Sequence, residues 1–146
     1  MSKRRGIDLQ TFHMEDYGIP YGYSPCLLAA HKYLISGSED EITLGKFLAA
    51  TARGYELAHV EPETAADSLF TIADHPTLHT LGRDFLLEAQ QYLSDGRYLV
   101  DESGRWGRMT SQKWCDFVTF LSSHDLLGSV TVRVNDLYTN AYISGV

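Results

Sequence analysis

Residues 18–25 restrict what this chain can fold into more than any other segment. They contain two glycines and two prolines within eight residues. Proline has no backbone N–H to donate, and glycine is disfavoured inside helices and strands, so no regular element can run through this stretch. The segment therefore separates a short opening from a long remainder that begins at Cys26.

Three short segments have strand-like patterns. Residues 7–14 alternate in part, with Phe12 and Met14 facing one side. Residues 130–134 alternate valine with polar residues, which also favours an extended segment. Residues 26–30 form a continuous apolar run, which is either a buried strand or the start of a helix. A strand-like opening without a nearby partner predicts pairing with another chain or with a stretch that this sequence lacks.

The rest of the chain is predicted to be helical. Ser38, with Glu41 three residues later, is typical of a capping box and begins the first helix. Pro62 suits the first turn of a second helix, and Thr110 is a plausible cap for a fourth, which ends at Gly128. A third helix is expected at about residues 78–93. One predicted inner face, at helical spacing, comprises Leu44, Phe47, Leu48, Thr51, Ala52 and Tyr55.

Length and charge exclude several classes of protein. The 146 residues fit a single domain, 1–146, with a formal net charge of −7 that disfavours nucleic-acid binding. The longest apolar runs fall far short of the roughly 20 residues that cross a bilayer, and the basic start is not followed by a signal-peptide segment. We therefore expect no membrane insertion and a cytoplasmic location for the chain as written.

Three segments, in this order and spacing, carry a family resemblance. They are residues 12–25, 46–56 and 136–143, with weaker support from Trp106 and Gly107 ahead of Trp114. Together they resemble the C-terminal half of the thiamine-pyrimidine-synthase-like family. That family includes bacterial substrate-binding proteins of ABC transporters for thiamine pyrimidine precursors and fungal enzymes that make the thiamine pyrimidine.

The resemblance implies a fold. Family members resemble type II periplasmic binding proteins, in which two α/β lobes clasp a ligand. By that likeness the chain is a helix-dominated α/β fold, a partial lobe with four main helices and two or three short strands. Residues 9–20 would be a crossover segment, and residues 24–146 would form the C-terminal part of the first lobe. A longer parent protein with an upstream signal would be periplasmic and would meet an ABC transporter permease.

The segment at residues 15–23 is the first candidate for ligand contact. Glu15 and Asp16 offer carboxylates to the amine and ring N–H donors of an aminopyrimidine. Tyr17, Tyr21 and Tyr23 offer flat faces for stacking. The alternative is a rigid turn whose tyrosines fill a core.

A long loop at residues 94–108 supplies the remaining candidate, Trp106. Loops of this length are often functional, and an aromatic side chain on one can close over a ligand. The alternative is that Trp106 packs the loop onto the helices.

No pattern predicts catalysis, a cofactor or a metal site. His75 and His79 are four residues apart, but Pro76 lies between them and the metalloprotease motif is absent. Cys26 and Cys115 form no Cys-x-x-Cys pair, so free thiols are expected, and a disulfide between them stays open. In the resemblance, the fungal enzymes carry their cofactor lysine and donor histidine in the N-terminal half, so no residue here inherits those roles.

These observations predict a small-ligand-binding module, incomplete alone, for a heterocycle like a thiamine pyrimidine precursor. One alternative is an enzyme fragment, which would need a cofactor lysine among Lys32, Lys46 and Lys113. Another is a non-catalytic domain that self-associates, because unpaired strand edges invite a homo-oligomer.

Overall fold

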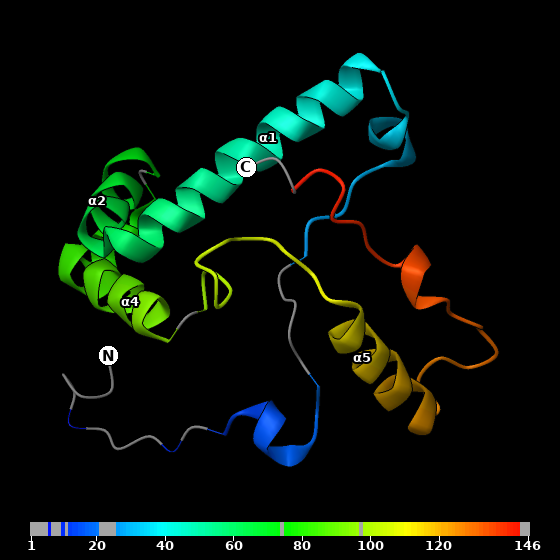
Figure 1. Cartoon of the computed structure of the whole chain (residues 1–146). Helices are drawn as coiled ribbons and strands as arrows, with labels where there is room; N and C mark the ends of the chain where they lie inside the picture. The colour runs from blue at the N-terminus through cyan, green and yellow to red at the C-terminus, as the bar shows by residue number, and fades with distance from the viewer. Residues whose placement is uncertain are drawn as a thin grey trace.

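The computed structural model describes residues 6, 10, 12–20, 26–73, 75–96 and 98–143. These residues form α-helices joined by loops and by short 3-10 turns (Figure 1). The helices are α1 (Glu39–Val60), α2 (Pro62–Ile72), α3 (Pro76–Leu81), α4 (Arg83–Asp95) and α5 (Ser111–Ser123). The 3-10 turns are η2 (Met14–Tyr17), η3 (His31–Leu34) and η4 (Val134–Asp136).

Helix α1 begins where the capping box predicts. The N–H of Glu41 donates to Ser38 Oγ at 3.0 Å, and Gly37 N–H donates to the Glu41 carboxylate at 2.6 Å. Acidic residues fill the first turn, where the positive end of the helix dipole favours them. This helix continues for 22 residues and supplies one wall of the site described below.

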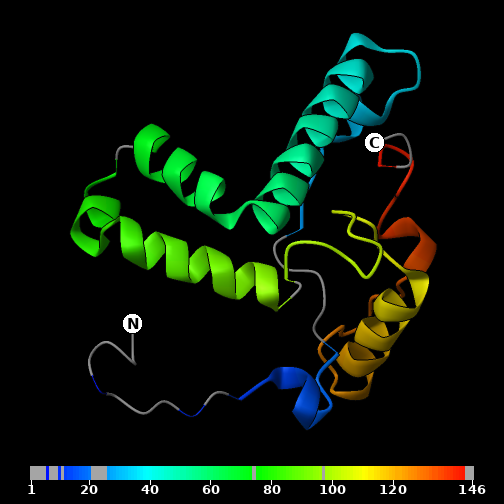
Figure 2. The same cartoon turned by 60° about the vertical axis from the view of Figure 1, so that its left-hand side comes forward.

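Helices α1, α2 and α4 pack together, and Figure 2 shows α2 and α4 lying side by side against the end of α1. Pro62 starts α2 directly after α1 because a first helical turn needs no N–H from that residue. The guanidinium of Arg83 in α4 binds both carboxylate oxygens of Asp67 in α2. Gln90 Nε2 donates to the carbonyl of Ala58 at 3.0 Å, which joins α4 to α1.

The predicted third helix is two helices. Gly82 adopts φ 80° and ψ 159°, a conformation that residues other than glycine rarely adopt, and it separates α3 from α4. The predicted start of the fourth helix is correct, because Thr110 caps α5 through the N–H of Lys113 at 3.4 Å, but the helix ends at Ser123 and not at Gly128.

Helix α5 belongs to a second group of packed residues. It packs with η4, and Trp114 stacks on Tyr138 with ring centroids 5.9 Å apart. Figures 1 and 2 both show α5 apart from α1–α4, with the loop after α4 leading from one group to the other. That loop lies beside both groups and carries the candidate site.

The core of the described residues is thin. Its buried apolar side chains are Leu48, Ala52, Ala66, Leu86, Leu99 and Val100. On the predicted inner face of α1, Leu48 and Ala52 are buried, whereas Phe47 is 54% exposed. Ile72 on α2 is 80% exposed. The predicted inner face of α1 is therefore only partly buried, because Phe47 and Tyr55 on it are exposed.

The prediction of an α/β fold with two or three short strands is wrong for the part of the chain that the structure describes, which has helices and no strand. Residues 26–30 and 130–133 are irregular, and Met14 begins a 3-10 turn. Residues 7–9 and 11 of the opening segment lie outside the described residues. An apolar extended segment becomes a strand only when a neighbour pairs with its backbone, and these segments have no such neighbour.

The sequence predicts no membrane-spanning segment. Among the described residues, no helix combines the length and the apolar character that a bilayer span requires.

Candidate functional site

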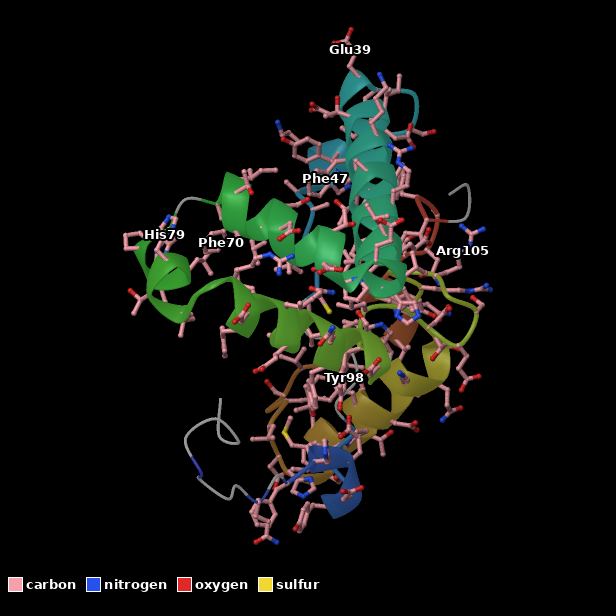
Figure 3. All side chains as sticks on the ribbon, turned by 90° about the vertical axis from the view of Figure 1, so that its left-hand side faces the viewer. Glu39, Phe47, Phe70, His79, Tyr98 and Arg105 are labelled. Carbon is pink, nitrogen blue, oxygen red and sulfur yellow. The ribbon has the colours of Figure 1, made fainter. Side chains whose placement is uncertain are left out.

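A cavity of about 290 Å³ lies where α1, the loop at residues 101–109 and the segment at residues 138–143 meet. We call it the Trp106 pocket. Figure 3 shows Arg105, one of its residues, beside the C-terminal half of α1. Ligand pockets range from about 300 to 1,000 Å³, so this volume suits one small ring with few substituents. The pocket is lined by Ala52, Glu56, Arg105, Trp106, Arg108, Asn140 and Ile143.

Helix α1 contributes a carboxylate to the pocket and an aromatic ring that supports Trp106. The ring of Tyr55 stacks on Trp106 with centroids 5.1 Å apart and planes inclined by 13°. Ala52 and Glu56 are four residues apart and therefore lie on the same face of the helix. Ala52 is almost completely buried, and its small side chain leaves room in the pocket.

The loop is held in shape by Asp101. Its Oδ1 accepts hydrogen bonds from Ser103 N at 2.8 Å, Ser103 Oγ at 2.6 Å and Arg105 N at 3.0 Å. The backbone N–H of Asp101 donates to the carbonyl of Arg105 at 2.8 Å. These bonds close a turn that fixes the backbone directly before Trp106.

The ionisation of Asp101 follows from the same contacts. Partial burial acts to raise the pKa of Asp101, but the hydrogen bonds from Ser103 and Arg105 and the positive charge of Arg108 act in the opposite direction and exceed it. The pKa of this carboxyl group therefore lies below its ordinary value, and the group is ionised at neutral pH.

Charged groups of both signs line the pocket. Arg105 Nη1 lies 3.8 Å from Glu56 Oε1, with the Arg105 side chain 56% exposed and that of Glu56 26% exposed. The two side chains form an ion pair, but their separation is longer than the 2.7–2.9 Å of a charge-assisted hydrogen bond. The pocket thus offers a carboxylate acceptor beside guanidinium donors.

The third wall comes from the C-terminal segment. Asn140 Oδ1 accepts from Met109 N at 3.0 Å, and Asn140 Nδ2 donates to Met109 O at 2.8 Å. Gly107 has φ +87°, and a Cβ there would lie 3.1 Å from Ile143 Cδ1. The loop and the C-terminal segment therefore approach each other closely, and that approach depends on a glycine.

Tyr142 fastens this segment to the start of α1. Its hydroxyl group donates to Glu41 Oε1 at 3.2 Å. Burial, followed by the negative charge of Glu41 and this hydrogen bond, raises the pKa of Tyr142. The carboxylate of Glu41 thus serves both the helix start and the wall of the pocket.

The structure places the predicted site residues in different regions. Trp106 lines the pocket. Glu15, Asp16 and Tyr17 lie in η2, are exposed and are not among the pocket residues. The ring of Tyr17 contacts Phe12 with centroids 5.9 Å apart. Tyr21 and Tyr23 lie outside the described residues, so ligand contact by the segment at residues 15–23 stays a prediction.

The sequence interpretation missed most of the pocket. Tyr55 was assigned to the predicted inner face, but it stacks on the loop instead of filling a core. Helical spacing was a signal that could have joined Glu56 to Ala52. No sequence signal places Arg105 and Arg108 opposite α1, or pairs Asn140 with Met109, because these contacts link segments distant in the chain.

The two histidines have local roles. His75 Nδ1 accepts a hydrogen bond from Thr77 N at 3.2 Å and caps α3. The rings of His79 and Phe70 pack edge to face with centroids 5.4 Å apart. Within the described ranges, no group of three or more His, Cys, Asp or Glu side chains could hold a metal ion. Cys26 and Cys115 form no disulfide with each other.

Comparison with known proteins identifies one family. The sequence profile of the family described as "NMT1/THI5 like" matches residues 1–65, which include the pocket residues Ala52 and Glu56. The match contains two of the three segments that carry the resemblance, and residues 136–143 lie beyond it. No curated protein and no solved structure matches the chain. The predicted family resemblance is therefore confirmed for one part of the chain: residues 1–65 are similar to the NMT1/THI5-like family.

Proposed function

We propose that the chain binds a small, flat, polar heterocycle of the thiamine pyrimidine precursor type in the Trp106 pocket. The observation that carries this proposal is a cavity lined by the indole ring of Trp106, on which Tyr55 stacks, and by the carboxylate of Glu56. The family match supports a substrate-binding or thiamine-pyrimidine-related role.

The chemistry of the pocket suits such a ring. An aminopyrimidine has flat faces that pack against aromatic side chains, and its amine group donates hydrogen bonds that a carboxylate such as Glu56 accepts. Arginine N–H groups can donate to the ring nitrogens or to a carbonyl substituent. Because the pocket is small and partly open, we expect a dissociation constant of roughly 0.1–1 mM, which corresponds to about −4 to −5.5 kcal/mol.

Tryptophan fluorescence tests this proposal directly. The chain has two tryptophans, so Trp114→Phe leaves Trp106 as the sole indole reporter. Titration of this variant with hydroxymethylpyrimidine and with its formylamino precursor should change the Trp106 emission saturably. Calorimetry on the unaltered chain should give the same dissociation constant.

A matched pair of substitutions assigns the site. Tyr55→Leu removes the ring that stacks on Trp106 and should weaken binding by about two- to tenfold, because an aromatic pair contributes about 0.5–1.5 kcal/mol beyond its burial. Tyr92→Leu disrupts another stacked pair, Tyr92 with Tyr98, which does not line the pocket, and should leave binding unchanged. Absence of any saturable signal in the Trp114→Phe chain would refute the proposed function.

A second candidate function, self-association, is favoured by the exposed apolar surface. Leu69 and Ile72 on α2 and Val60 at the end of α1 are all at least 48% exposed. We propose that a second copy of the chain covers this face, through helices and not through the strand edges expected from the sequence. Its test is given in the Discussion.

A further inference from the structure

We infer that the ligand of the Trp106 pocket carries an anionic group, a carboxylate or a phosphate, which Arg105 and Arg108 bind. This inference rests on the proposed function and narrows its substrate class.

The charge of the pocket lining differs from that of the chain. The chain has 12 basic and 19 acidic residues and a formal net charge of −7. Among the pocket residues, two arginines accompany a single carboxylate, Glu56. The lining therefore carries one more positive than negative charge, although the loop itself also contains Asp101 and Glu102.

The geometry leaves the arginines suited to an anion. A guanidinium group has five N–H donors in a planar fork, so Arg105 can contact an anion while its 3.8 Å ion pair with Glu56 persists. The nearby carboxylate of Asp101 uses its Oδ1 to accept three hydrogen bonds within the loop. Asp101 thus holds the loop in the shape that presents Arg105 and Arg108 together.

The aromatic side chain in the pocket indicates that the ligand combines a ring with the anionic group. Trp106 lies between the two arginines in sequence, and its side chain stacks on Tyr55. A cavity of about 290 Å³ holds one ring and one acid group but little more. The pocket therefore fits a single-ring heterocycle whose acid substituent points toward the loop.

Matched ligand pairs test the inference. In the Trp114→Phe chain, nicotinate is compared with nicotinamide, and the phosphate monoester of 3-pyridinemethanol with the parent alcohol. Each pair shares its ring and differs in charge. We expect the anionic member to bind about tenfold more tightly, the size expected for a charge-assisted hydrogen bond. The pair with the larger ratio identifies carboxylate or phosphate as the preferred group.

Substitutions locate the anion. Arg108→Gln and Arg105→Gln should each reduce the anionic preference to less than threefold. Arg133→Gln removes an exposed arginine that pairs with Asp136 and does not line the pocket, so it should leave the preference unchanged. Circular dichroism and thermal unfolding confirm that each variant is folded as the parent chain is.

The outcomes separate this inference from the proposed function. Equal binding of the charged and neutral members overturns the inference and leaves the binding function in place. A preference for the anion that survives both pocket substitutions also overturns it, because the anion then binds elsewhere. If no pyrimidine or pyridine compound changes the Trp106 signal, the proposed function itself fails.

Discussion

Gly107 allows the loop to approach Ile143 closely because glycine has no side chain. Its φ of +87° is one that side chains rarely adopt, and an added Cβ would lie 3.1 Å from Ile143 Cδ1. Gly104, in the same loop, has φ +78° but open space where a Cβ would be. Substitutions at the two glycines can therefore distinguish the effect of backbone strain, which both share, from that of steric contact, which arises at Gly107.

Gly107→Ala should lower the free energy of unfolding by about 1–2 kcal/mol, because left-handed backbone is unfavourable with a Cβ, and it should also weaken ligand binding. Urea unfolding and the fluorescence titration measure the two effects. Gly104→Ala should show the stability loss with a smaller effect on binding. Gly54→Ala, in the middle of α1 with no atom near its Cβ, should raise stability by about 0.5–1 kcal/mol. Equal binding by the Gly104 and Gly107 variants would contradict the role given to Ile143.

Asp101 makes the loop sensitive to acid. Its pKa in the folded chain is below its ordinary value, so its ionised form is favoured by folding. The resulting stabilisation is complete above the ordinary carboxyl pKa of about 4 and is lost as the pH falls through the folded value. In the Trp114→Phe chain, the Trp106 emission should therefore change below about pH 4. Asp101→Asn should show a disturbed emission already at pH 7, and an unchanged spectrum there would argue against Asp101 as the organiser of this loop.

At the scale of whole elements, the helices were more predictable than their surroundings. Ser38, Pro62 and Thr110 mark helix starts through their own backbone and side-chain chemistry, so the sequence identifies these starts correctly. The break at Gly82 was missed because an isolated glycine within a helical pattern is often tolerated. Strands were mispredicted because alternation shows only that a segment could pair, and pairing depends on a neighbour.

The capping box at the start of α1 should contribute measurably to the stability of the chain. Ser38→Ala should lower the free energy of unfolding by about 1 kcal/mol, because the N–H of Glu41 loses its acceptor. Ser111→Ala is the same chemical change in the first turn of α5, where Thr110 is the cap, and should change stability by less than about 0.5 kcal/mol. Urea unfolding followed by circular dichroism compares them. Similar losses in both variants would mean that the Ser38 cap contributes nothing specific.

At the scale of the whole molecule, the chain exposes more surface than a compact monomer of its size. Its accessible area is 10932 Å², whereas about 7,500 Å² is expected at 16.4 kDa. Obligate homodimers bury about 2,000–5,000 Å² in total, so the excess is large enough for an interface with a second copy. The site was hard to predict because its walls come from segments about 30 to 90 positions apart, and local patterns carry no information about such contacts.

We expect light scattering after size-exclusion chromatography to give a mass above 16.4 kDa at high protein concentration. Ile72→Lys places a charge on the exposed apolar face of α2 and should shift the chain toward monomer. Thr119→Lys adds the same charge at an exposed polar position of α5 and should have little effect. A strict monomer at all concentrations, with no binding of an apolar dye, would exclude association through this face.

The two hydrogen bonds between Asn140 and Met109 have a consequence for synthesis on the ribosome. Helix α1 leaves the exit tunnel long before residues 138–143, so a nascent chain lacks one side of its binding cavity until that segment has also emerged. Ligand cannot assist the early folding of α1. It can stabilise only a chain that already includes residues 138–143, by an amount set by the ligand concentration relative to the dissociation constant.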